Sequence, residues 1–76
     1  MREKIVEILG DLNEELIEDF ERDLFESEVL DSFDIVKLVV QLEDAFGITI
    51  GVEMVTAENF RTVEAIIKLV ESIAKE

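Results

Sequence analysis

The sequence predicts an all-α fold, in which three longer helices and one short helix form a small bundle. Apolar residues recur at helical spacing in three segments, and helix breakers are few, since the chain has no proline and only three glycines. The 76 residues include no cysteine and no histidine, so neither disulfides nor a Cys/His zinc site can stabilise this short chain. Packed helices are the remaining route to a core, and we expect residues 1–76 to form one domain.

The first predicted helix lies near the N-terminus. Four apolar residues there follow the i, i+3, i+4, i+7 pattern with charges between them: Ile5, Ile8, Leu9 and Leu12. Gly10 weakens the end of this helix. Residues 13–30 are less regular, and their first part either continues the helix or forms an irregular turn. The remainder is predicted to be a long loop whose Leu24, Phe25 and Leu30 reach the core, and a long loop in a small domain tends to be functional.

The second helix is predicted from about Ser32 to Phe46, with Ser32 as its N-cap. Asp34 lies in the first turn, where an acid suits the positive end of the helix dipole. Gly47 suits the position after the helix, since glycine adopts the left-handed conformation that ends many helices. One continuous apolar stripe forms the expected core face: Ile35, Leu38, Val39, Leu42 and Phe46.

The last part of the chain contains the short helix and the third long one. We expect one short helical turn within residues 52–58, with Met54 and Val55 pointing inward. Thr62 is the expected cap of a final helix over residues 63–74. The apolar stripe of that helix is Val63, Ile66, Ile67, Val70 and Ile73.

The second helix carries an additional apolar face that a simple bundle does not require. Phe33, Val36 and Val40 fall opposite the core stripe, with Lys37 and Asp44 beside them. Three apolar residues on one outer face predict a docking patch with a charged rim. The alternative is that this helix lies deeper in the bundle and is buried all round.

The charge balance narrows the possible partners. The formal net charge is −13, and the segment from Asp11 to Asp34 holds eleven acids and one base, Arg22. Phosphate groups would be repelled, so we expect neither nucleic acid nor an anionic membrane as a partner. Partners that present lysine and arginine are favoured instead.

Two further classes are excluded by pattern. No apolar run approaches the roughly 20 residues that span a bilayer, and the N-terminus lacks a signal-peptide segment, so we expect a cytoplasmic protein without membrane insertion. Asp11, Asn13 and Glu15 have the spacing that begins an EF-hand loop. Leu16 and Arg22 occupy the positions that need glycine and glutamate, so we predict no metal site.

Ser32 stands out because it follows the acidic stretch and begins an amphipathic helix. A nucleophilic serine needs a nearby base, and the chain has no histidine to supply one. We therefore predict no enzymatic activity. A serine at a helix N-terminus is instead a good attachment point, because another enzyme can bring its own base and the helix dipole favours an attached phosphate.

Around Ser32 the chain resembles the acyl carrier protein family, whose members bear phosphopantetheine. The matching stretches, in order, are Leu24-Phe25, Leu30 to Leu38, Leu42-Glu43, Phe46 to Ile48, Ile50, Glu58-Asn59-Phe60, Thr62-Val63 and Ile66. An Asp-Ser pair alone is a weak signal. Together with its apolar flanks and the later Glu-Asn-Phe it is a specific one, and the matches cover roughly two thirds of the chain.

The resemblance implies a four-helix bundle of acyl-carrier type, with a long loop between helices 1 and 2. It implies that Ser32, preceded by Asp31, carries 4′-phosphopantetheine, which a Mg²⁺-dependent phosphopantetheinyl transferase takes from coenzyme A. An acyl or aminoacyl group would be held on this arm as a thioester. The implied partners are that transferase and loading and acceptor enzymes with basic docking surfaces, and we expect a monomer. The positions that match partner contacts in the family are Phe33, Asp34, Val36, Val40, Glu43 and Asp44.

Three departures from the family pattern bear on the type of carrier. Glu28 stands where many members have glycine, Lys37 where fatty-acid carriers are often acidic, and Gly51 where proline is common. The spacing from Phe46 to Val63 is closer to D-alanyl and other stand-alone aminoacyl carriers than to the fatty-acid synthase carrier.

Two functional questions stay open at this point. The cargo can be D-alanine, another amino acid, a fatty chain or a polyketide unit, because the loading enzyme selects it. The alternative function is a carrier-like interaction module that is never modified and acts through the apolar face of the second helix. A small hydrolase built on Ser32 has little support without a base.

Overall fold

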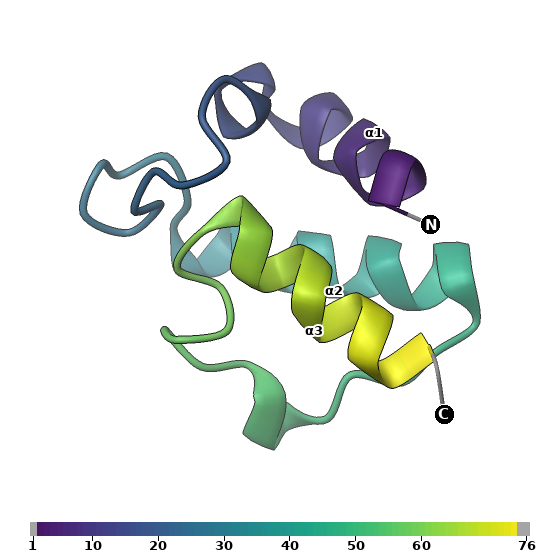
Figure 1. The fold of residues 1–76 in the computed structure, drawn as a ribbon. Helices are drawn as coiled ribbons and strands as arrows, with labels where there is room; N and C mark the ends of the chain where they lie inside the picture. Colours follow the sequence, from purple (N-terminus) through teal and green to yellow (C-terminus); the bar gives the residue numbers. More distant parts are fainter. Residues whose placement is uncertain (1, 75–76) are drawn as a thin grey trace.

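The computed structural model describes residues 2–74, and its fold is all-helical (Figure 1). The three α-helices are α1 (Arg2–Leu12), α2 (Ser32–Phe46) and α3 (Val63–Ala74). Two short 3₁₀ helices, η1 (Glu14–Ile17) and η2 (Val52–Met54), lie in the connections, and residues 2–74 contain no strand. None of the helices in this part of the chain is long and apolar enough to cross a membrane.

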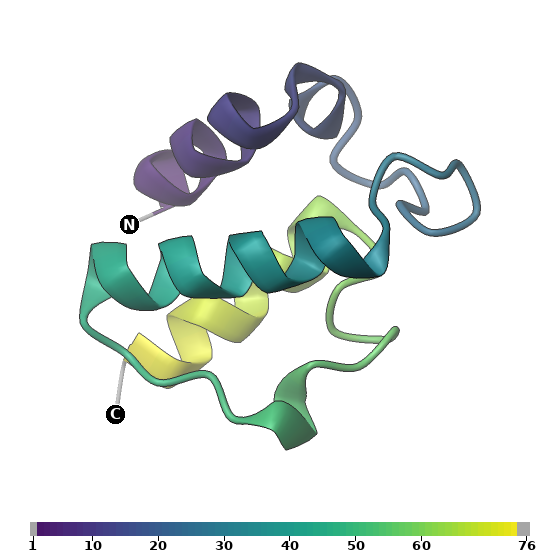
Figure 2. The same cartoon turned by 180° about the vertical axis from the view of Figure 1, so that it is seen from behind.

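The helices form a bundle whose two ends differ. In both views α1 runs opposite to α2 and α3, and the long α1–α2 connection lies at the end where α2 and α3 begin (Figures 1 and 2). The start of α1 and the end of α3 lie at the other end of the bundle. The predicted bounds of the second helix are confirmed, as is its termination at Gly47, which has a φ of 62°.

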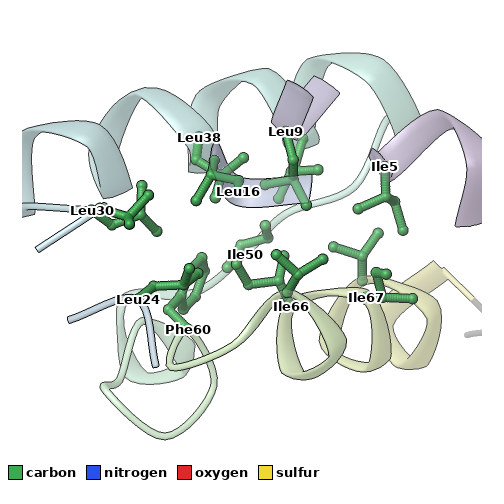
Figure 3. Close-up of a cluster of buried hydrophobic side chains, with 14 residues drawn as sticks. Ile5, Leu9, Leu16, Leu24, Leu30, Leu38, Ile50, Phe60, Ile66 and Ile67 are labelled. Atoms are coloured by element: carbon green, nitrogen blue, oxygen red, sulfur yellow. The ribbon is translucent and has the colours of Figure 1, made fainter. Parts of the chain in front are cut away.

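The core is formed by the predicted stripes together with residues of the connections (Figure 3). Phe60 is its largest fully buried side chain. On α2, Leu38 and Leu42 are buried, and the other stripe residues are half-buried against the core. The complete set of buried apolar residues is Ile5, Leu9, Leu16, Leu24, Val29, Leu30, Leu38, Leu42, Ile50, Phe60, Val63, Ile66, Ile67 and Val70. Burial of this apolar surface is the main force that holds so short a chain together.

The long connection before α2 is fixed to the rest of the molecule by backbone hydrogen bonds. The Leu24 N–H donates to the Arg61 carbonyl at 2.7 Å, and the Glu64 N–H donates to the Phe20 carbonyl at 3.2 Å. Leu24 and Leu30 are buried as predicted, and Phe25 is half-buried. The connection is therefore a structural part of the core that also leads directly into α2.

The short element after α2 differs from its prediction in part. A three-residue 3₁₀ helix, η2, lies where one short helical turn was expected, and Met54 packs against the core as predicted. Val55, however, is 36% exposed rather than inward. The reason is the loop that follows, which is closed by Asn59. Its Nδ2 donates to the Met54 carbonyl at 2.8 Å, and its N–H donates to Thr56 Oγ1 at 3.2 Å. This closure turns the chain so that Phe60, and not Val55, enters the core.

An ion pair joins α1 and α3. The Arg2 guanidinium donates to the Glu64 carboxylate and lies 5.7 Å from the centre of the Phe20 ring. The hydrogen bond from Arg2 lowers the pKa of Glu64, and the same contact raises the pKa of Arg2. The start of α3 is capped as predicted, because the Ala65 N–H donates to Thr62 Oγ1 at 3.0 Å.

Candidate functional site

The segment that leads to Ser32 forms a tight helical turn that ends at Glu28. The Asp23 carboxylate accepts the N–H groups of Phe25 and Glu26, at 3.1 and 2.9 Å, and so starts the turn. The turn ends as many helices do, because the Val29 N–H donates to the Leu24 carbonyl and the Glu28 N–H donates to the Phe25 carbonyl. In this arrangement the residue before the final donor is left-handed.

That left-handed residue is Glu28, with a φ of 61°. Glycine usually occupies a left-handed position of this kind. Glutamate in its place, one of the departures from the family pattern, is strained there and lowers the stability of the fold. The turn survives because Leu24 and Val29, on either side of it, are both buried in the core. After this turn, Leu30 is buried in the core, and the next two residues, Asp31 and Ser32, are exposed.

The N-cap of α2 is Asp31, so the prediction that Ser32 caps this helix is wrong. The Asp31 carboxylate accepts the Asp34 N–H at 2.9 Å, and the Asp34 carboxylate accepts the Asp31 N–H at 3.4 Å. This reciprocal pair is a capping box, and it is completed only when the cap stands three residues before Asp34. Ser32 is therefore the first residue of the helix, and its hydroxyl has no capping role.

Ser32 is exposed at the start of α2. Within residues 2–74 its hydroxyl makes no hydrogen bond. It opens onto a shallow hollow of about 260 Å³ lined by Ser32, Phe33, Val36 and Lys37. No lining group can serve as a general base of the histidine type, and the hydroxyl is open to a foreign active site. The arrangement suits covalent attachment by another enzyme and not catalysis by this chain.

The outer face of α2 carries three exposed apolar residues, which we call the outer α2 patch: Phe33, Val36 and Val40. Their side chains are 72%, 64% and 57% exposed, so the alternative of a helix buried all round is wrong. Lys37 belongs to the same surface, since its Nζ lies 5.5 Å from the centre of the Phe33 ring. The patch begins next to Ser32 and follows the helix for two turns.

The acidic residues predicted to contact partners are not equivalent. Asp34 is half-buried and is held in the capping box, while the half-buried Glu43 accepts the Ile50 N–H at 2.8 Å and so fixes the chain after α2. Asp44 is exposed and lines a separate hollow together with Lys4. The structure thus brings Ser32 and the patch together. Asp44 lies toward the opposite end of α2, about 18 Å from Ser32 along the helix axis at 1.5 Å per residue.

The sequence placed Lys37 beside the outer apolar face of the second helix and marked it as a departure from the family pattern, but assigned it no role at the serine. A signal for that placement is present in the sequence. Lys37 follows Phe33 by four residues, and residues at this spacing are neighbours on a helix surface. Side chains on a helix also lean toward its N-terminus, which carries the ammonium group toward the first turn.

Comparison with known proteins gives a consistent result. The family model described as the phosphopantetheine attachment site matches residues 1–70. A D-alanyl carrier protein of Streptococcus suis (strain 05ZYH33) is 38% identical over 68 residues, which cover 88% of this chain and 86% of that protein. The D-alanyl carrier protein of Lactococcus lactis subsp. cremoris (strain MG1363) is 33% identical over 78 aligned positions, covering 100% and 99%. The D-alanyl carrier protein of Leuconostoc citreum (strain KM20) is 34% identical over 74 residues, which cover 96% of this chain and 95% of that protein.

Proposed function

We propose, since this chain belongs to the phosphopantetheine attachment-site family, that Ser32 is the residue to which the phosphopantetheine arm is joined. The chain is a carrier and not an enzyme: it holds an acyl-type group as a thioester on 4′-phosphopantetheine and presents that group to other proteins. The observation that carries the assignment is the exposed Ser32 hydroxyl, which is free of capping and stands at the first turn of α2.

The backbone at the start of α2 suits a phosphodiester. The first backbone N–H groups of α2 are directed toward this end of the helix, where they favour negative charge. In the attachment step the Ser32 oxygen forms a bond to the phosphorus that bears pantetheine in coenzyme A. The bond from that phosphorus to adenosine 3′,5′-bisphosphate breaks, and a base of the transferase takes the hydroxyl proton. The attached arm supplies a terminal thiol, which is the site of the thioester.

We further propose that the outer α2 patch is where partner enzymes dock. Its exposed apolar surface lies beside Ser32, so a partner that covers the patch has its active site near the arm. The carrier role requires contact with a transferase and a loading ligase. The excess of acids favours partners with basic surfaces, and Asp44 is the exposed one among the three predicted acidic contacts. Asp34 and Glu43 contribute mainly by holding the backbone.

The proposed cargo is D-alanine. Support comes from the relatives, which carry the name D-alanyl carrier protein and align with nearly the whole chain. We also propose that residues 1–76 act as one carrier domain in the cytoplasm, and that η2 takes the place of the short helix in the four-helix form of the family fold.

Attachment is tested by intact mass. Incubation with coenzyme A, Mg²⁺ and a broad-specificity phosphopantetheinyl transferase is expected to add one phosphopantetheinyl group to the wild-type chain. Ser32→Ala is expected to abolish the gain, whereas Ser72→Ala, which alters an exposed serine of α3, is expected to retain it. A gain that survives Ser32→Ala places the arm elsewhere and overturns the assignment.

Cargo is tested on the product of that reaction. The modified carrier is incubated with ATP, a D-alanine-activating ligase and either D-alanine or L-alanine, and in parallel with an acyl ligase and octanoate. We expect a hydroxylamine-sensitive mass gain with D-alanine. Efficient loading with octanoate and none with D-alanine would identify a fatty-acyl carrier instead.

A further inference from the structure

Among residues 2–74, the hollow beside Ser32 contains one cationic side chain. Its lining in this part of the chain is Ser32, Phe33, Val36 and Lys37, of which only Lys37 carries a charge. Lys37 is also the single basic residue in the sequence of α2. An anionic group attached at Ser32 therefore enters a hollow in which Lys37 is the one cation contributed by the described residues.

The ammonium group of Lys37 is directed toward the serine end of the helix. Its Nζ lies 5.5 Å from the centre of the Phe33 ring, and Phe33 is the residue directly after Ser32. Lys37 and Phe33 are both exposed, so the ammonium group keeps its contact with water and can move without disturbing the core. Among residues 2–74 no carboxylate lies within ion-pair distance of Lys37.

The other described bases are placed elsewhere. Arg2 is paired with Glu64, and Arg22 and Arg61 lie 3.8 Å from Glu18 and Asp23. Lys4 lines a hollow with Asp44 and Ala45, near the opposite end of α2. Lys68 lies on α3, does not line the hollow beside Ser32, and helps Arg2 to lower the pKa of Glu64. Among the bases of residues 2–74, these positions leave Lys37 as the cation at the serine.

The surroundings of Ser32 create a need for a counter-ion. The capping box places the carboxylates of Asp31 and Asp34 beside the start of α2. A phosphodiester at Ser32 adds a further negative charge, and the neighbouring carboxylates repel it even in water. A mobile ammonium group that already lines the same hollow offsets this repulsion.

We propose that Lys37 is the counter-ion of the phosphodiester on Ser32 and positions the root of the arm along the outer α2 patch. When the arm is attached, the ammonium group moves from the Phe33 ring to a phosphodiester oxygen. Lys37 is thus a positioning residue, and its move also takes the ammonium group away from the Phe33 ring. This inference rests on the proposed function, because it requires that Ser32 carry the arm.

The test uses the modified full chain and ³¹P NMR at low salt. Wild type is compared with Lys37→Gln, with Lys37→Arg, and with Lys4→Gln as a matched lysine near the other end of α2. We expect Lys37→Gln to shift the phosphodiester resonance and to increase the mobility of a ¹³C-labelled pantetheine arm. Lys37→Arg is expected to restore both wild-type values, and Lys4→Gln to change neither. The Lys37→Gln difference is expected to shrink as salt is added, since the contact is exposed.

A second measurement is independent of the phosphorus signal. The Phe33 ring protons are expected to shift between the unmodified and the modified wild-type chain, and to shift less in Lys37→Gln. Identical ³¹P positions in wild type and Lys37→Gln, or an equal displacement in Lys4→Gln, overturn the inference while leaving the proposed function intact. Failure of the proposed function is seen separately, as absence of the mass gain at Ser32.

Discussion

At the scale of single residues, one aspartate decides what the serine can do. Asp31 and Ser32 are both good N-cap residues, so local preference alone does not choose between them. Asp34 decides, because its side chain can return a hydrogen bond to the cap only from three residues away. The sequence therefore located the start of α2 but not its cap, and the exposed hydroxyl depends on this choice.

The cap assignment can be tested by stability. Asp31→Ala is expected to lower the free energy of unfolding by about 1 kcal/mol, the usual value of a lost N-cap. Ser32→Ala is expected to change it by only a few tenths of a kcal/mol, because a serine at the first helical position makes no capping bond. Urea denaturation of the unmodified chains measures both. A larger loss for Ser32→Ala than for Asp31→Ala contradicts the assignment.

Glu28 offers a second test at this scale. Its φ of 61° is strained for any residue with a side chain, by about 1 kcal/mol. Glu28→Gly is therefore expected to raise the urea midpoint, although the greater freedom of glycine in the unfolded chain offsets part of the gain. Glu28→Ala removes the same charge and keeps the strain, so it should not reproduce the increase. If alanine stabilises as much as glycine, relief of charge repulsion is the cause and not backbone strain.

At the scale of elements, apolar periodicity predicted the three α-helices well and the connections poorly. Each helix presents one apolar stripe to the core, which a 3.6-residue period reveals directly. The region after α2 is governed by contacts that no period encodes. Glu43 accepts the Ile50 N–H and Asn59 donates to the Met54 carbonyl, and these bonds decide that Phe60 is buried and Val55 is not.

The outer α2 patch gives a prediction for this scale. Val40 is 57% exposed, so Val40→Asp is expected to leave the fold intact and to reduce docking by removing apolar contact. We expect kcat/KM for transfer of phosphopantetheine to Ser32 to fall about tenfold, which corresponds to a loss of about 1.4 kcal/mol. Val52→Asp is the matched control, since Val52 is 87% exposed but lies on η2. An equal loss in both variants indicates a general effect of added negative charge.

At the scale of the whole molecule, the long α1–α2 connection joins the three helices into one packed unit. It contributes buried side chains to the core, and its backbone bonds to Arg61 and Glu64 join it to the start of α3. The sequence predicted that this segment reaches the core through Leu24 and Leu30. It did not predict the partners of its backbone, because those bonds join residues that lie far apart in the chain.

The ion pair between α1 and α3 predicts a pH dependence. The hydrogen bond from Arg2 lowers the pKa of Glu64, so folding favours its charged form. The resulting stability is complete above the ordinary glutamate pKa, about 4.3, and is lost as the pH falls through the lowered pKa of the folded state. Glu64→Gln is therefore expected to be less stable than wild type at pH 7, by a small amount because the pair is exposed, and the gap should close on acidification.

Urea midpoints over a pH series measure that gap. Glu58→Gln removes one negative charge from an exposed loop residue and controls for the change in net charge. A difference between Glu64→Gln and wild type that stays constant from neutral to acidic pH means that the pair does not contribute through its charge.

The placement of the helix ends has a practical consequence. The first residue of α1 and the last of α3 lie at one pole of the bundle, and α2 begins with Ser32 at the other (Figures 1 and 2). A tag or a surface linker joined to either end of the chain therefore holds the molecule with its serine facing the solution. Immobilised on a biosensor chip in this way, the carrier can be offered to transferases and ligases in turn, and their kinetics can be compared on one oriented layer.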